Sequence, residues 1–444
     1  MSISIINGRL IDPAHGIDDQ LDLHIDGEFV VAVGDAPAEF AAAEVIDARG
    51  CVVCPGLVDL AASLREPGYE HKATLASEAA AAARGGITTV LCTPDTNPVI
   101  DNSAVVELIH RKARKLGQTR ILTTGALTRG LAGEQLSEMA ALKQAGCVAV
   151  SNARAPLAST LVERRALEYA ATFDLTVFLR PEDRHLRAGG CAHEGAISTR
   201  LGLPAIPSAA ESVAVARDLA LAEHTQAKVH FRALSTLTAA RMIHEAQAAG
   251  LAVTADVAAH QLHLTEMDVD DFNAECHVSP PLRTLTDRDA LRRAVADGTI
   301  AAICSDHQPH EPDAKQRPFP ETEPGISCLE TLLGLTLRLV EEQVLDLPTA
   351  LARVTSGPAD ILGLPYGRLN AGSPADVCVF DPQRHWTLDV SRMRSEGRNT
   401  PFGGWEFPGR ITHTLFNGRV VYRAADDRSE ERRVGKECRS RGSP

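Results

Sequence analysis

Between residues 57 and 304, short apolar runs alternate with alanine-rich stretches whose apolar positions recur at helical spacing. Apolar runs of about four to eight residues without a polar face are typical of strands buried on both sides in a parallel sheet. Alternation of such strands with helices indicates βα units, and eight of them close a TIM (β/α)8 barrel. The expected strands are Leu57–Ser63, Ile87–Cys92, Arg120–Thr124, Val148–Ser151, Thr176–Leu179, Lys228–Phe231, Ala252–Val257 and Ile300–Cys304.

The pattern changes at both ends of this α/β region, which we assign to residues 55–365. Residues 1–54 and 366–425 contain short apolar runs broken by glycines, so each segment predicts a half of a small β module. Residues 426–444 have no periodicity and are rich in Arg, Glu, Gly and Ser, which predicts a disordered tail foreign to the fold. The strands expected outside the barrel are Ser2–Asn7, Leu21–Ile25, Phe29–Val33, Glu44–Ile46, Asp376–Phe380 and Ile411–Tyr422.

Composition narrows the class of protein. The net charge of −13 argues against a nucleic-acid-binding surface, which requires basic patches. The ten cysteines have no repeated spacing and no charged-then-apolar signal precedes them, so reduced thiols and a cytoplasmic location are expected. No apolar run is long enough to span a membrane.

The chemistry of the chain centres on its first barrel strand and the loop after it, Pro55-Gly56-Leu57-Val58-Asp59-Leu60-Ala61-Ala62-Ser63-Leu64-Arg65-Glu66-Pro67-Gly68. This stretch resembles the strand of dihydroorotases, a family of cyclic amidohydrolases, that reads Asp-x-His-x-His-Leu-Arg-Glu-Pro-Gly. Further landmarks in the family order are Gly86-Ile87-Thr88-Thr89-Val90, Thr96-Asn97-Pro98, Pro280-Pro281-Leu282-Arg283 and Ser305-Asp306-His307-Gln308-Pro309-His310. The resemblance covers about residues 1–425 and implies that both chain ends join in one β-sandwich beside the barrel.

The resemblance also shows which residues are missing. The two histidines of the family are zinc ligands, and side chains two apart in a strand share a face, so both would enter one barrel mouth. Here Ala61 and Ser63 match them. The family's bridging acid is matched by Ala153, and its two further histidines by Arg180 and Ala233. The resemblance therefore implies no zinc cofactor.

Some family positions keep a polar residue. Asp306 matches the acid that serves the family as metal ligand and general base, and we expect it instead to be ion-paired with Arg154, Arg180 or Arg232, because a buried carboxylate needs a partner. The residues that match the family's carboxylate clamp are Arg65, Asp95 and His310, with Asp95 in place of an Asn. Three further histidines are expected to be structural hydrogen-bonding residues: His230, His260 and His307.

Two hypotheses for function follow from the resemblance. In the first, the chain is a catalytically inactive dihydroorotase-like subunit, like the non-catalytic chain that assembles with the aspartate carbamoyltransferase catalytic chain in bacterial pyrimidine (UMP) biosynthesis, dodecameric in known cases. In the second, it is an active zinc-dependent dihydroorotase or other cyclic amidohydrolase with a relocated or atypical metal site. A metal lowers the pKa of bound water to about 7, and no alternative Ser/His/Asp or Cys/His nucleophile is visible, which favours the first.

Overall fold

The computed structural model describes residues 2–424, so the tail predicted at 426–444 lies outside the described residues. The eight expected barrel strands are all present, with ends within two residues of the prediction. They form one parallel sheet whose spatial order follows the chain order. The barrel strands are β8 (Leu57–Ala62), β9 (Ile87–Cys92), β10 (Arg120–Ala126), β11 (Cys147–Ser151), β12 (Thr176–Leu179), β15 (Val229–Phe231), β16 (Val253–Ala258) and β17 (Ala302–Cys304).

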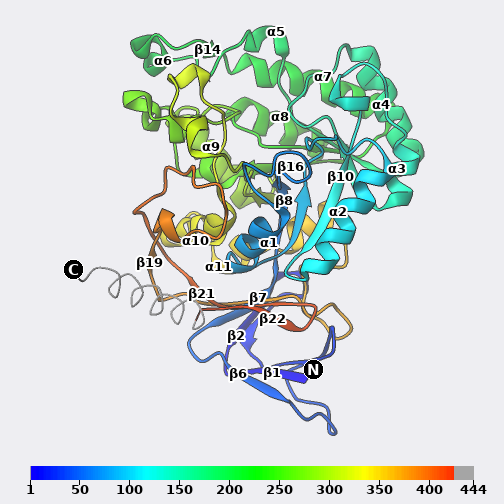
Figure 1. The fold of residues 1–444 in the computed structure, drawn as a ribbon, viewed down its shortest axis with the longest axis vertical. Helices are drawn as coiled ribbons and strands as arrows, with labels where there is room; N and C mark the ends of the chain where they lie inside the picture. Colours follow the sequence, from blue (N-terminus) through cyan, green and yellow to red (C-terminus); the bar gives the residue numbers. More distant parts are fainter. Residues whose placement is uncertain (1, 425–444) are drawn as a thin grey trace, which may run out of the picture.

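Helices surround this sheet, as Figure 1 shows. Their starts follow local sequence: Thr74 and Ser77 form a reciprocal capping box at α1, and the Asn102 side chain accepts from two amides at the start of α2. The helices of the barrel region are α1 (Leu75–Arg84), α2 (Ser103–Leu116), α3 (Met139–Ala145), α4 (Thr160–Thr172), α5 (Arg184–Arg187), α6 (Ala196–Leu201), α7 (Ala209–Thr225), α8 (Leu237–Ala248), α9 (Leu285–Asp297), α10 (Leu332–Glu341), α11 (Leu347–Ala352) and α12 (Ser356–Ile361).

Strands from both chain ends form a second body beneath the barrel (Figure 1). A four-stranded sheet has the order β5-β4-β1-β6, and a six-stranded sheet has the order β22-β21-β18-β7-β2-β3. The expected β-sandwich is therefore present, and β7 of the N-terminal part pairs directly with β18 of the C-terminal part. Its strands are β1 (Ser2–Ile6), β2 (Arg9–Asp12), β3 (Ile17–Gln20), β4 (Leu23–Asp26), β5 (Phe29–Val33), β6 (Glu44–Asp47), β7 (Val52–Pro55), β18 (Val377–Asp381), β21 (Arg410–Phe416) and β22 (Arg419–Arg423).

Two short strand pairs lie in loops outside the barrel sheet and the sandwich. The loop after β12 carries β13 (Ala192–His193) and β14 (Ala205–Ile206), and a late loop carries β19 (Trp386–Thr387) and β20 (Glu406–Phe407). Within residues 2–424, no helix is long and apolar enough to cross a bilayer.

Candidate functional site

The barrel closes at the point where β8 meets the segment after β17. The Ser63 amide donates to the His307 carbonyl at 2.9 Å, and the His307 amide donates to the Ala61 carbonyl at 3.0 Å. The two positions that match the family's His-x-His pair therefore lie beside Asp306 at the carboxyl ends of the strands, where TIM-barrel enzymes place their active sites. Ala61 is fully buried in the apolar cluster inside the barrel, and the Ser63 hydroxyl contacts that of Thr93 at 3.0 Å.

Three more residues stand at positions where the family has metal ligands: Ala153, Arg180 and Ala233. They follow β11, β12 and β15 at the same end of the barrel. The Ala153 amide donates to the Ser151 hydroxyl at 3.0 Å, and the Ala233 amide donates to Asp256 at 2.5 Å. Arg180 donates to the Ser279 hydroxyl at 2.5 Å. Methyl and guanidinium groups are not zinc ligands, and within the described part of the chain no three His, Cys, Asp or Glu side chains are grouped to hold a metal ion. The residues of the mouth do not fit the family's metal centre.

The backbone of the mouth is strained. Arg65, Ala153, Ala233 and Asp306 all have positive φ, at 65°, 50°, 51° and 43°. A non-glycine residue held in this region costs of order 1–3 kcal/mol, and such residues cluster at active sites. The mouth therefore keeps an unfavourable backbone geometry at two positions where the side chain is now only a methyl group.

Asp306 lies between two of the three arginines that were expected to pair with it. Its carboxylate is 3.6 Å from Arg154 Nη2 and 3.7 Å from Arg232 Nη2. The ion pairing is confirmed for these two arginines but not for Arg180, which donates a hydrogen bond to the Ser279 hydroxyl instead. Both ion-pair distances exceed hydrogen-bond length, so Asp306 offers charge to the arginines without satisfying their N–H groups.

The arginines influence one another. Burial and the neighbouring charge of Arg154 together lower the pKa of Arg180 to about 10. Burial also acts to lower the pKa of Arg232, but Asp256 and Asp306 outweigh it and raise this pKa. The mouth is therefore a site where three guanidinium groups are crowded together.

Two of the three histidines are hydrogen-bonded as expected, and the third is not. His230 contacts Thr254 at 2.8 Å and Asp256 at 3.0 Å, while His307 contacts Glu78 at 2.6 Å and accepts from the Cys328 amide at 3.0 Å. His260 is only 1% exposed, yet neither ring nitrogen has a partner. The prediction for His260 is wrong, because the charges of Asp306 and Arg154 act on the ring but neither group hydrogen-bonds to it.

The residues that match the carboxylate clamp are only partly brought together. Arg65 donates to the Pro309 carbonyl at 3.0 Å and the Gln308 side chain at 3.1 Å, and it contacts His310 Nε2 at 3.3 Å. Burial, together with the charges of Arg65 and Lys72, lowers the pKa of His310 to about 2, so its ring is neutral. Asp95 instead accepts from Thr93 at 2.5 Å.

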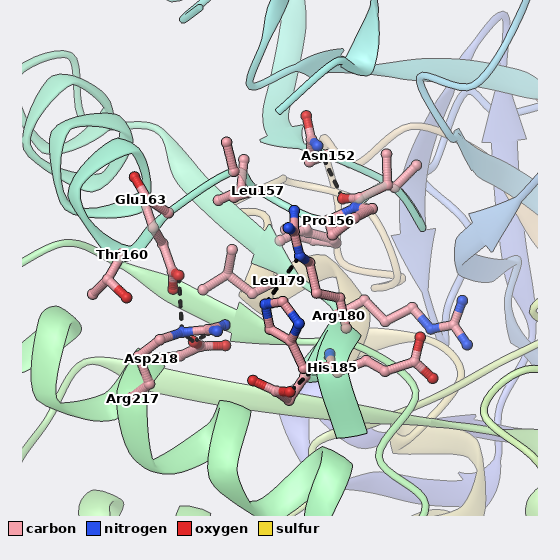
Figure 2. A pocket seen from close by; sticks show the side chains of 18 residues that line it. Asn152, Pro156, Leu157, Thr160, Glu163, Leu179, Arg180, His185, Arg217 and Asp218 are labelled. Atoms are coloured by element: carbon pink, nitrogen blue, oxygen red, sulfur yellow. Dashed lines mark hydrogen bonds and ion pairs between the residues drawn. The ribbon is translucent and has the colours of Figure 1, made fainter. Parts of the chain in front are cut away.

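A cavity of about 190 Å³ lies outside the mouth, between α4 and α7. Ala153 and Arg180 form one wall of it, and Figure 2 shows Arg180 on the opposite side from Glu163 and Arg217. Arg217 contacts Glu163 at 3.0 Å and Asp218 at 2.7 Å, and burial together with the charge of Asp218 raises the pKa of Glu163 to about 9. Sequence reasoning missed this acid pair because both residues lie within helices, where single acids are usually solvent-exposed.

Comparison with known proteins places this geometry in a family. A protein-family model described as "Dihydro-orotase-like" matches residues 50–238 of this chain. A dihydroorotase-like protein of Pseudomonas putida is 50% identical over 422 residues, which cover 95% of this chain and 99% of the relative. The chain belongs to the dihydroorotase family, within the amidohydrolase superfamily.

Other members of the dihydroorotase family are similarly related to the chain. A dihydroorotase-like protein of Pseudomonas aeruginosa is 50% identical and a protein named dihydroorotase from Syntrophotalea carbinolica is 47% identical, and each is matched over its whole length by at least 95% of this chain. Among solved structures, the L-hydantoinase (dihydropyrimidinase) of Arthrobacter aurescens has a TM-score of 0.85 at 23% identity, with 95% of this chain and 96% of that chain covered. The fold is thus the barrel with a β-sandwich that such amidohydrolases have.

Proposed function

We propose that this dihydroorotase-family chain is a catalytically inactive subunit that assembles with, and supports, aspartate carbamoyltransferase in pyrimidine biosynthesis. The observation that carries the proposal is the side-chain set of the mouth. Ala61, Ser63, Ala153, Arg180 and Ala233 stand at the five positions that would supply metal ligands. Without a metal-bound water the family's nucleophile is absent at neutral pH.

Two features of the mouth support descent from an active enzyme. The left-handed backbone at Ala153 and Ala233 is costly, and in an enzyme such strain serves to aim ligands. Asp306, at the position of the general base, lies between Arg154 and Arg232, so its charge is engaged by the protein.

The partner is proposed by resemblance to the inactive chains of bacterial aspartate carbamoyltransferase. The test is co-expression of this chain with the aspartate carbamoyltransferase catalytic chain, followed by size-exclusion chromatography with light scattering. We expect one large complex, dodecameric by mass, and a less stable or less active transferase when this chain is omitted. Separate elution of two proteins with unaltered transferase activity would contradict the assembly.

The inactive state is tested separately. Purified protein should hold less than about a tenth of a zinc ion per chain by elemental analysis after dialysis, and should neither hydrolyse dihydroorotate nor cyclise carbamoyl aspartate above background. One or two tightly held zinc ions with chelator-sensitive turnover would instead establish the alternative, an active dihydroorotase with an atypical metal site.

A further inference from the structure

Three guanidinium groups are crowded around the centre of the barrel mouth. Arg154 and Arg232 share Asp306, and Arg180 lies close enough to feel the charges of both arginines and of Asp306. The other nearby carboxylate, Asp256, already accepts from the Ala233 amide at 2.5 Å and contacts His230 at 3.0 Å. Glu182 acts on Arg180 and Asp95 on Arg232 from further away, so Asp306 is the carboxylate that two of the three arginines share.

Several buried donors in this cluster have no acceptor. Arg154 Nη2 and Arg232 Nε make no hydrogen bond, and neither nitrogen of His260 makes one. Arg232 is 7% exposed and His260 1% exposed, whereas the Arg154 side chain is 29% exposed with its Nη2 atom buried. Buried polar groups are nearly always paired, because a buried donor without an acceptor loses the hydrogen bonds it had with water. Unpaired donors from three separate loops around one point indicate that an acceptor belongs between them.

We propose that the barrel mouth binds a small oxyanion, a carboxylate or phosphate group, between Arg154, Arg180, Arg232 and His260, where other members of the family hold metal cations. The proposed occupant is therefore an anion, whereas the occupant in other family members is a cation. This inference goes beyond the proposed function and does not depend on it, because it concerns the mouth alone.

The donor chemistry selects an oxyanion over other occupants. A guanidinium presents N–H groups in a planar fork that matches the paired oxygens of carboxylate and phosphate. His260 is neutral, since burial lowers its pKa to about 4, so it donates one hydrogen bond. Arg65 and Asp95, at the edge of the mouth, carry opposite charges and act on one another. The cavity walled by Ala153 and Arg180 adjoins the cluster.

The experiment is isothermal titration calorimetry of the full chain with inorganic phosphate and, separately, with succinate, both at constant ionic strength in chloride. Saturable binding of at least one of them, at one site per chain, is the expected result. Preference for phosphate or for succinate assigns the class of the occupant. Absence of saturable binding by both overturns the proposal.

Two variants locate the binding. Arg154→Gln removes a charged donor and should weaken binding at least about tenfold. The matched control is Arg164→Gln, whose side chain is 47% exposed on α4 and pairs with Glu168, and it should bind like the wild type. Equal affinity of Arg154→Gln and the wild type overturns the proposal.

The second variant, Asp306→Asn, has the opposite expected sign. Removing the carboxylate that competes for Arg154 and Arg232 should tighten anion binding by about tenfold, whereas a purely structural ion-pair network would show no such gain. Circular dichroism checks that each variant is folded. Should Arg154→Gln fail to fold, Asp306→Asn decides alone, and unchanged or weaker binding in it overturns the proposal.

Discussion

Ala153 and Ala233 have the left-handed backbone conformation in which glycine is the favoured residue. The sequence does not reveal these two positions, because glycine is the residue that signals a positive φ and alanine gives no such signal. In contrast, the vacant ligand positions themselves could be predicted, since each lies in a motif with a fixed place on a barrel strand. The missing metal ligands can therefore be read from residue types alone. The backbone strain cannot, because it depends on the contacts of neighbouring loops.

Relief of this strain gives a first prediction. Ala153→Gly should raise the free energy of unfolding by about 1 kcal/mol, because glycine adopts positive φ without steric cost. The matched control is Ala246→Gly in α8, which is equally buried at 9% exposure but helical, and it should lower stability by about 1 kcal/mol. Urea denaturation measures both, and equal destabilisation by the two changes would contradict the strain at Ala153.

His277 gives a second prediction, on pH. It is buried at 6% exposure, contacts Thr322 at 2.6 Å, and burial with nearby Lys315 lowers its pKa from 6.5 to about 4. Between pH 6.5 and 4 the unfolded chain therefore binds a proton here that the folded chain does not. The contribution of His277 to stability is complete above pH 6.5 and is lost as the pH falls, at about 1.4 kcal/mol per pH unit.

The measurement is the stability difference between wild type and His277→Asn, taken by urea denaturation from pH 7 to pH 4.5. The contributions of other titrating groups cancel in this difference. The stability advantage of the wild type over the variant should therefore shrink by about 1.4 kcal/mol per pH unit below pH 6.5. His385→Asn is the control. The hydrogen bond to Glu341 raises the pKa of this exposed histidine, so its contribution to stability falls as the pH rises. The change should be small because solvent screens the pair. A difference that does not vary with pH would refute the lowered pKa of His277.

At the scale of elements, continuous apolar runs made the barrel strands predictable to within two residues. The strands β2, β3 and β7 escaped prediction, and the reason is clearest for β3. Its sequence Ile-Asp-Asp-Gln has no apolar face, and only its pairing with β2 makes it a strand. The small elements between β12 and α7 were likewise missed because short elements carry too few residues for a periodic pattern.

One helix junction gives a third prediction. Glu211 of α7 is 2% exposed and accepts hydrogen bonds from the amides and hydroxyls of Ser235 and Thr236, which begin α8. Glu211→Gln replaces an acceptor oxygen by an N–H2 group that faces these donors, and should cost roughly 2–4 kcal/mol of stability. Glu245→Gln on the exposed face of α8 is the control, where the side chain is 66% exposed. Equal stability of the two variants would refute the role of Glu211 as a clamp.

At the scale of the whole molecule, the α/β class, the barrel and the sandwich could all be predicted, whereas the mouth could be predicted only in part. The sequence named the arginines and Asp306 but not which of them meet. It also assigned His260 a hydrogen bond that it lacks, because hydrogen-bond partners are set by loops that approach from distant strands. The acid pair of α4 and α7 was missed for a different reason, because acids within helices are usually exposed.

The arrangement of the mouth gives a fourth prediction, on the double change Ala61→His and Ser63→His. It restores two of the family's ligands, but zinc in a catalytic site takes three protein ligands and a water, and the arginines oppose a dication. No chelator-sensitive dihydroorotase turnover should appear with added zinc. The variant should also lose about 1–3 kcal/mol, because Ala61 is fully buried in the barrel interior. Turnover that a chelator abolishes would show that further ligands exist.

The pairing of β7 with β18 joins residues 324 positions apart, as at Cys54 and Cys378. During synthesis on the ribosome, β7 emerges early with the edge that β18 will cover still open. That edge cannot be paired until the whole barrel and the strand beyond it have been translated. Open strand edges invite pairing with other chains, and distant pairings form slowly. The nascent chain is therefore most exposed to misassembly, and most dependent on chaperones, until its last strands leave the exit tunnel.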